Sequence, residues 1–409
     1  MKRISLNSIL LFCLVIPFIM NYRLSWLETP FWLFGLIFLA LLANISIDLL
    51  DFKEALYFKL KTIILWVVIV LSLGSGFLSA IIVRHETSPT YMIHDIILQQ
   101  ESAIRFLIHG KNPYTTSYFG TPLEKWNYSP NEINPALYHF VMEPLYVIFS
   151  IPFYFVSTKL FGFFDGRIPL LFLFLVLLFF AAKVPKENKN KLLFPMLLAF
   201  NPAYISYLME GRSDIFMFTF LFAGFYFLYQ KKNVLSGILF ALSFAVKQSA
   251  WPLFPFYVAY LALKLKNVKK VIFALIPFAV TFAIFTGPFF LWGPHSFIES
   301  TVSYLSGTAS HSYPISGYGL GMLLFQLGFI KDVHMYYPFI IWQIVLGIPL
   351  LLVLLKYLKK NTNIQTLIIC YGIFLFVYWY ISRYFNNSHL GYLSMVFLSA
   401  YFWPTENAA

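Results

Sequence analysis

The chain has 409 residues, of which 60% are hydrophobic, 21% aromatic and only 11% charged. A soluble domain carries about 25% charged residues, so this composition excludes one. Apolar runs near the roughly 20 residues that a spanning helix needs recur along the chain. We therefore predict an all-α polytopic membrane protein, with one transmembrane domain over residues 1–409.

The net charge of +12 does not indicate nucleic-acid binding. Most basic residues lie in short clusters between apolar runs, where they set the orientation of the chain in the membrane. Cys13 and Cys370 both lie inside apolar runs, so neither a disulfide framework nor a metal site is expected.

Three spans are expected before the first large polar loop, at residues 4–20, 31–49 and 62–83. Lys2 and Arg3 predict a cytoplasmic N-terminus. No small-residue cleavage site follows the first run, which is therefore expected to be retained. The polar stretch between the second and third spans is cytoplasmic because of its lysines, Lys53, Lys59 and Lys61. Residues 85–141 then lie on the outer face, and we interpret them as an outer catalytic loop.

His94 and Asp95 stand at the head of this loop. Apolar residues recur over residues 95–108 with the spacing of an amphipathic helix. At the start of such a helix, Asp95 is equally well interpreted as a cap or as a base that deprotonates a hydroxyl. Gly110-Lys111-Asn112-Pro113-Tyr114 follows, and its pattern predicts a helix-ending turn.

A basic loop at residues 183–191 should be cytoplasmic, so only one net crossing separates it from the outer loop. We assign that crossing to residues 168–182. Residues 143–164, broken by Pro144 and Pro152, are expected to dip into the outer leaflet and return. Irregular backbone at that depth is tolerated where protein covers it.

Eight more spans are expected, at residues 192–208, 215–229, 234–246, 253–263, 271–292, 337–355, 366–381 and 390–403. The total is about twelve transmembrane helices plus the outer-leaflet hairpin, with the C-terminus in the cytoplasm. A second polar outer stretch covers residues 293–335, and residues 320–330 within it are apolar but too short to span.

Mixed polar groups gather on the outer side, and charges near a membrane interior indicate function by default. Glu210 and Asp214 are equally well interpreted as carboxylates that orient Arg212 towards a phosphate or as its internal ion-pair partners. Lys247, beside Gln248, and Arg383 could each neutralise a phosphate or extend to the membrane interface.

Four later histidines also fall on the outer side, His295, His311, His334 and His389. Their spacing fits no standard zinc pattern, and among these four only His311 is a candidate substrate contact.

Three features resemble the GT-C superfamily of integral-membrane glycosyltransferases, especially bacterial polyprenyl-phosphate-dependent mannosyltransferase-like proteins. The first is Asp95, followed by a helix and the GKNPY turn at residues 110–114. The second is Asn201-Pro202 ahead of the Gly211-Arg212-Ser213-Asp214 loop, and the third is Arg383-Tyr384. The resemblance covers roughly residues 60–400.

The chain departs from this family in two places. It has three expected spans ahead of the catalytic loop where many relatives have one, and Met142-Glu143-Pro144 stands where relatives often have Tyr-Pro-Pro. No role is transferred to Glu143 for that reason.

The resemblance implies a GT-C-like fold in a bacterial cell membrane, with the active site on the outer face. It also implies that Asp95 is the catalytic base of an inverting transfer of a mannose-like hexose from a polyprenyl phosphate to a hydroxyl. Arg383, with Lys247 or Arg212, would stabilise the departing phosphate. One carboxylate suffices because the leaving group needs little protonation, whereas glycoside hydrolysis uses two.

The candidate substrate-binding residues are His94, Asn112, Tyr114, Glu210, Arg212, Asp214, Lys247, Gln248, His311 and Arg383. The partners implied are the polyprenyl-phosphate sugar, a lipid or glycan acceptor and membrane lipid. No cofactor is expected, and no sequence pattern supports a divalent metal. Two other functions stay open, a transporter or flippase for lipid-linked sugars and a polysaccharide polymerase or ligase.

Overall fold

The computed structural model describes residues 3–21, 30–129 and 131–405, and Lys2, used above for orientation, lies outside them. The described chain is almost entirely helical. Its one β ladder is a parallel pair of two-residue strands, β1 (Ser316–Gly317) and β2 (Tyr384–Phe385). The prediction of a helical protein is confirmed.

Four described helices are long and apolar enough to cross a membrane: Phe31–Leu49, Glu54–Thr87, Val268–Trp292 and Phe339–Lys360. They fall on four of the expected spans. The other expected spans are shorter helices or broken ones, so the structure does not establish a count of twelve. For example, residues 192–208 are divided at Asn201-Pro202, where the Asn201 side chain accepts the Ala203 amide hydrogen (3.0 Å) and proline offers none.

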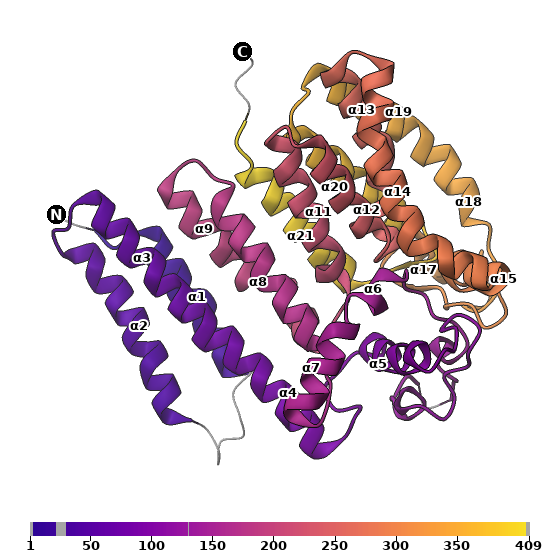
Figure 1. Cartoon of the computed structure of the whole chain (residues 1–409), viewed down its shortest axis with the longest axis horizontal. Coiled ribbons are helices and arrows are strands. Elements are labelled where there is room, and N and C mark those ends of the chain that lie inside the picture. The colour runs from indigo at the N-terminus through magenta and orange to yellow at the C-terminus, as the bar shows by residue number, and fades with distance from the viewer. Residues whose placement is uncertain (1–2, 22–29, 130, 406–409) are drawn as a thin grey trace.

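The N-terminal helices form a layer at one end of the molecule (Figure 1). They are α1 (Leu6–Asn21), α2 (Phe31–Leu49) and α3 (Glu54–Ile69), and α3 continues through a π-helical turn into α4 (Ser75–Thr87). Lys61 is buried on α3, with its Nζ 2.7 Å from a carboxylate oxygen of Asp48. Lys53 and Lys59, the other two lysines used for orientation, are exposed.

Helix α5 (Asp95–Ile108) has the bounds expected from its amphipathic spacing. Two glutamines on its buried face hold the following connection against it. Gln99 donates to the carbonyls of Ala136 and His139, and Gln100 donates to Tyr146 and Ser150, all within 2.9 Å. The helix is thus fixed beneath the connection and the start of α6 (Leu145–Ile148).

The chain then returns to the place it left at the end of α4. After α6 it forms α7 (Ile151–Phe161), turns at Gly162, and enters α8 (Arg167–Lys183). The His85 ring on α4 stacks on the Phe163 ring with centroids 3.8 Å apart. Residues 86–162 therefore leave and rejoin the bundle at one end of α4.

The remaining helices build the central bundle and its far side (Figure 1). They are α9 (Asn188–Ala199), α10 (Ile205–Glu210), α11 (Asp214–Tyr229), α12 (Asn233–Phe244), α13 (Phe254–Leu265), α14 (Val268–Trp292), α15 (Pro294–Ile298), α16 (Tyr304–Ser306), α17 (Leu320–Gln326), α18 (Phe339–Trp342), α19 (Ile348–Lys360), α20 (Ile364–Tyr380) and α21 (Asn387–Phe402).

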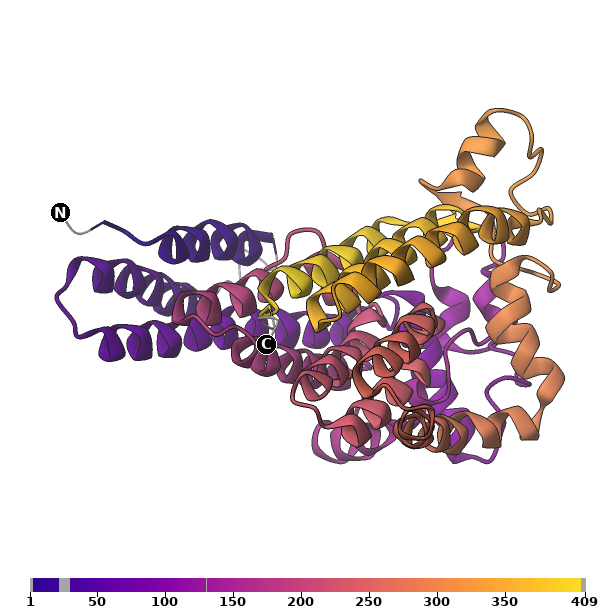
Figure 2. The ribbon, with the colours of Figure 1, turned by 90° about the horizontal axis from the view of Figure 1, so that it is seen from above.

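Helix α11 is buried on nearly all sides by α8 and α12, while α20 packs on α21. Figure 2 shows the segment around α17 projecting from the bundle. This segment has a small hydrophobic cluster of its own, made by Ile315, Leu324, Ile330 and Phe339.

Candidate functional site

Asp95 is the first helical residue of α5, and the cap position belongs to His94. The interpretation of Asp95 as the helix cap is therefore wrong. Nδ1 of His94 lies 2.7 Å from Oδ1 of Asp95 and 3.2 Å from the amide nitrogen of Ile96. His94 is thus both the cap of α5 and the side chain that lies against the Asp95 carboxylate.

The Asp95 carboxylate is half-buried, with 17% of the side chain exposed. Its Oδ2 accepts a hydrogen bond from Nδ2 of Asn134 (3.3 Å). Burial favours the neutral acid, but the charge and hydrogen bond of His94 and the charge of Arg212 outweigh it and hold the pKa of Asp95 below its ordinary value. Asp95 is therefore an ionised carboxylate at neutral pH.

The backbone brings the loop at residues 210–214 to this carboxylate. The His94 amide donates to the carbonyl oxygen of Glu210 at the end of α10 (2.8 Å). Nε of Arg212 is 3.7 Å from Glu210, too far for a hydrogen bond, and it has no hydrogen-bond partner among the described residues. Arg212 is thus a cation beside Asp95 with an unused donor.

Asp214 does not pair with Arg212 as its main partner. It begins α11, is buried, and its Oδ1 accepts a hydrogen bond from Nζ of Lys247 (2.6 Å). Lys247 precedes the 3-10 turn at Gln248–Leu253 and keeps 22% of its side chain exposed. The pair fixes a partly exposed ammonium group close to Arg212.

Three tyrosines that sequence reasoning missed lie near these charges. Tyr128, Tyr304 and Tyr313 lie close enough to feel the charge of Asp95. The Tyr313 ring lies 4.9 Å from the Tyr384 ring and 6.2 Å from the Tyr304 ring between centroids. Burial, then the charge of Asp95, raises the pKa of Tyr313, so its hydroxyl remains a donor. No sequence signal marks these tyrosines, since they come from separate loops.

Asn112 and Tyr114 instead form part of the packing. The Asn112 side chain accepts the Tyr114 amide hydrogen (2.9 Å), as a helix-ending turn predicts. The Tyr114 hydroxyl donates to the carbonyl of Met142 (2.8 Å), and its ring packs on Phe140 and Phe297. Within the described ranges, no hydrogen bond, ion pair or ring contact joins either residue to Asp95.

His311 and Arg383 also lie apart from the charged cluster. The exposed His311 ring stacks on Tyr138 with centroids 3.8 Å apart. The buried guanidinium of Arg383 donates to four backbone carbonyls, those of Tyr313, Val333, His334 and Met335. Arg383 therefore holds the outer segment and positions Tyr313, a different place from the phosphate contact we expected.

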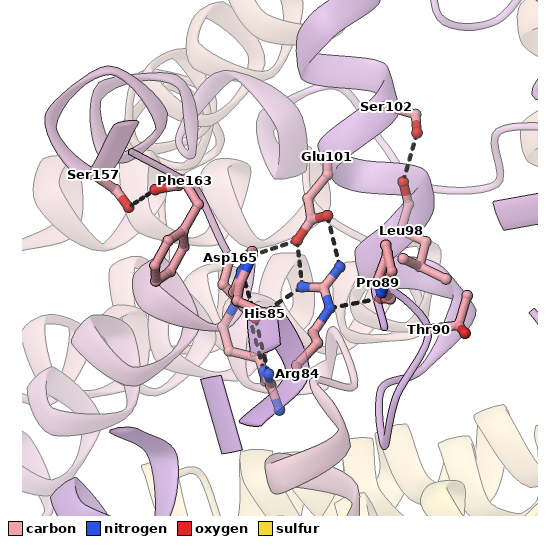
Figure 3. A network of polar contacts seen from close by, with 12 residues as sticks. Arg84, His85, Pro89, Thr90, Leu98, Glu101, Ser102, Ser157, Phe163 and Asp165 are labelled. Carbon is pink, nitrogen blue, oxygen red and sulfur yellow. Dashed lines mark hydrogen bonds and ion pairs between the residues drawn. The ribbon is translucent and has the colours of Figure 1, made fainter. Parts of the chain in front are cut away.

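A buried ion-pair network, also missed from the sequence, fixes α5 to the bundle (Figure 3). Arg84 contacts both oxygens of Glu101 (2.8 and 2.9 Å) and Oδ2 of Asp165 (2.8 Å), and Arg167 also pairs with Asp165 (2.9 Å). The sequence did contain a signal for this network. Arg84 stands at the outer end of an expected span, and the acids Glu101 and Asp165 are expected on the same side of the membrane.

The three comparisons, with protein-family models, curated proteins and solved structures, find no match for this chain. Among residues 3–21, 30–129 and 131–405, no group of three or more His, Cys, Asp or Glu side chains is placed to hold a metal ion.

Glu143 is wholly buried in the non-helical connection before α6, outside the helices that are candidate spans. Its Oε1 accepts from Nε2 of Gln248 (3.2 Å), which also donates to the carbonyls of Val141 and Thr301. Oε2 has no hydrogen-bond partner among the described atoms. Burial raises the pKa of Glu143 to about 8. Gln248 thus holds a buried acid.

This raised pKa predicts a pH-dependent stability. Below pH 4.5 both the folded and unfolded states are protonated, and between 4.5 and about 8 only the folded state retains the proton. Stability therefore falls as pH rises through this window, by up to about 1.4 kcal/mol per pH unit. Glu143→Gln should remove that slope in thermal unfolding of the purified protein, whereas Glu86→Gln, at an exposed acid, should keep it. If the stability of wild type and of Glu143→Gln changes with pH by the same slope, Glu143 is not the group responsible for the pH dependence.

Proposed function

We propose that the chain is an inverting membrane glycosyltransferase of the GT-C type, which transfers a mannose-like hexose from a polyprenyl phosphate to a hydroxyl acceptor. The observation that carries the proposal is an ionised Asp95 close to the cation Arg212, with a second cation, Lys247, held on Asp214 two residues after Arg212. These come from α5, the α10–α11 loop and the segment after α12. A base and an anion-stabilising pair in one place suit the displacement of a phosphate by a hydroxyl.

In the proposed reaction, the acceptor oxygen forms a bond to C1 of the hexose while the bond from C1 to the phosphate oxygen breaks. The acceptor proton passes to Asp95, and the electron pair leaves on the phosphate. Arg212, through its unused Nε donor, and Lys247, through its remaining N–H groups, would stabilise that charge. Attack from the face opposite the phosphate inverts the anomeric centre. Tyr313 can donate to a sugar hydroxyl.

The proposal keeps the expected membrane arrangement. Residues 85–141 form the catalytic loop on the outer face of a bacterial cell membrane, both termini are cytoplasmic, and about twelve crossings and the hairpin at residues 143–164 complete the GT-C-like fold. Apolar helices capable of spanning a membrane support the setting, and exposed apolar side chains offer surfaces to a polyprenyl tail. Arg383, His311, Asn112, Tyr114 and Gln248 have no part in this chemistry.

The function is tested with purified protein in lipid nanodiscs, supplied with polyprenyl-phosphate hexoses and candidate lipid or glycan acceptors. Mass spectrometry should find acceptor heavier by one hexose and an equal amount of free polyprenyl phosphate. Intact donor that only changes leaflet would identify a flippase instead, and products with many added sugars would identify a polymerase.

A further inference from the structure

A cavity of about 300 Å³ lies at the outer end of α4, between α5 and α7. Its lining includes Arg84, His85, Glu101, Arg105, Tyr154 and Phe163. Figure 3 shows the Arg84 network on one side of this region. Asp95 and Arg105 are ten residues apart on α5, which is about 15 Å along the helix, so the cavity is separate from the proposed active site.

The carboxylates near the cavity are already occupied. Both oxygens of Glu101 accept from Arg84, and Oε1 also accepts the Gly166 amide hydrogen (3.1 Å). Asp165 accepts from Arg84 and Arg167. Two arginines balance these two acids, so the network offers little attraction to a cation.

The groups that remain are hydrogen-bond donors, and Arg105 adds a positive charge to them. Arg105 is half-buried, and within the described chain its side chain makes one hydrogen bond, to Oγ of Ser102 at a weak 3.3 Å. Arg84 uses four of its five N–H groups, on Pro89, Glu101 and Asp165. His85, stacked on Phe163, adds a ring that is partly exposed. This donor set matches an anion, and a guanidinium matches phosphate oxygens in particular.

The cavity adjoins an apolar surface. Tyr154 and Thr158 of α7 line it, while Phe155, Val156, Leu160 and Phe161 of the same helix are exposed. The other wall residues are mostly apolar, with two prolines and two phenylalanines among them. A ligand held here would meet positive donors at its head and an apolar helix face beside them.

We propose that this cavity binds the phosphate head of an anionic lipid whose chains lie along α7. The inference goes beyond the glycosyltransferase activity and does not depend on Asp95. A membrane glycerophospholipid and a polyprenyl phosphate both have the required chemistry, a phosphate anion on an apolar chain.

Binding is measured by titrating the detergent-purified protein with phosphatidylglycerol in one series and a polyprenyl phosphate in another, using native mass spectrometry. Arg105→Gln should weaken the first binding step by about tenfold or more, since a charged hydrogen bond is lost. Arg105→Lys, which keeps the charge, should lose less. Lys159→Gln removes an exposed charge from α7 outside the cavity lining and should leave the affinity unchanged.

A loss of lipid affinity in Arg105→Gln, with no loss in Lys159→Gln, supports the site. The lipid series in which this loss appears identifies which of the two lipids the cavity binds. Equal losses for Arg105→Gln and Lys159→Gln would indicate surface attraction and overturn the proposal. Unchanged binding by Arg105→Gln, or no binding of either lipid, would overturn it as well. Asp95→Asn should bind like wild type, so failure of the glycosyltransferase proposal and failure of this one remain distinguishable. Thermal unfolding checks that each variant is folded.

Discussion

Replacing Asp95 with asparagine is expected to lower the rate of hexose transfer by about 10²–10⁴-fold. Asparagine has nearly the same shape but does not accept the acceptor proton at neutral pH. The loss should appear in kcat, with little change in KM for the donor, because the phosphate is held by other residues. Initial rates of product formation measure both constants, and Glu124→Gln, at an exposed acid in the same loop, is the matched control.

The pH profile adds a second check on Asp95. Because its pKa lies below the ordinary value of 3.8, the carboxylate stays ionised as the pH falls from neutrality towards that value. Loss of activity through protonation of this base is therefore expected only below pH 3.8. A carboxylate with a lowered pKa is also a weaker base. The loss of rate in Asp95→Asn is therefore expected near the lower end of the range given above. Near-normal transfer by Asp95→Asn would remove Asp95 as the base.

Arg84→Met is expected to destabilise the folded protein by about 3–5 kcal/mol, because it leaves buried charges without their partner. Glu101 would lose its two contacts with Arg84, and Asp165 would retain only Arg167 as its close cation. Methionine fills much of the same space, so the loss comes mainly from charge. Denaturant unfolding in mild detergent measures the change.

Arg105→Met makes the same substitution at a half-buried arginine of α5 that contacts no carboxylate within the described chain. A loss of about 1 kcal/mol or less is expected there. Adding Glu101→Gln to Arg84→Met should recover part of the loss, since one unpaired charge is removed. If Arg84→Met and Arg105→Met have equal effects, the network does not carry the stability assigned to it.

The sequence predicted features that depend on local periodicity or composition. The amphipathic spacing of residues 95–108 specified the bounds of α5, and the GKNPY turn folds as its glycine, asparagine and proline require. Four long apolar runs became helices of membrane-spanning length. Asn201-Pro202 is where a run expected to span continuously is divided, because proline lacks an amide hydrogen.

Contacts between distant segments could not be predicted in the same way. Arg84 meets Asp165 across 81 positions, and Tyr313, from a different loop, lies close enough to feel the charge of Asp95. The position of Arg383 against the spanning bundle suggested a phosphate contact, but its guanidinium meets carbonyls 48 to 70 positions away. A single sequence shows where a charged residue lies relative to an expected span. It does not show which residue that charge will contact, because this depends on how the loops fold over the bundle.

The most direct test of the glycosyltransferase account is an electron cryo-microscopy structure of Asp95→Asn with a bound polyprenyl-phosphate hexose, since this variant should retain the donor. We predict that the phosphate lies between Arg212 and Lys247, with C1 of the hexose facing the side chain at position 95. A phosphate bound elsewhere, with the hexose turned away from position 95, would contradict the proposed active site.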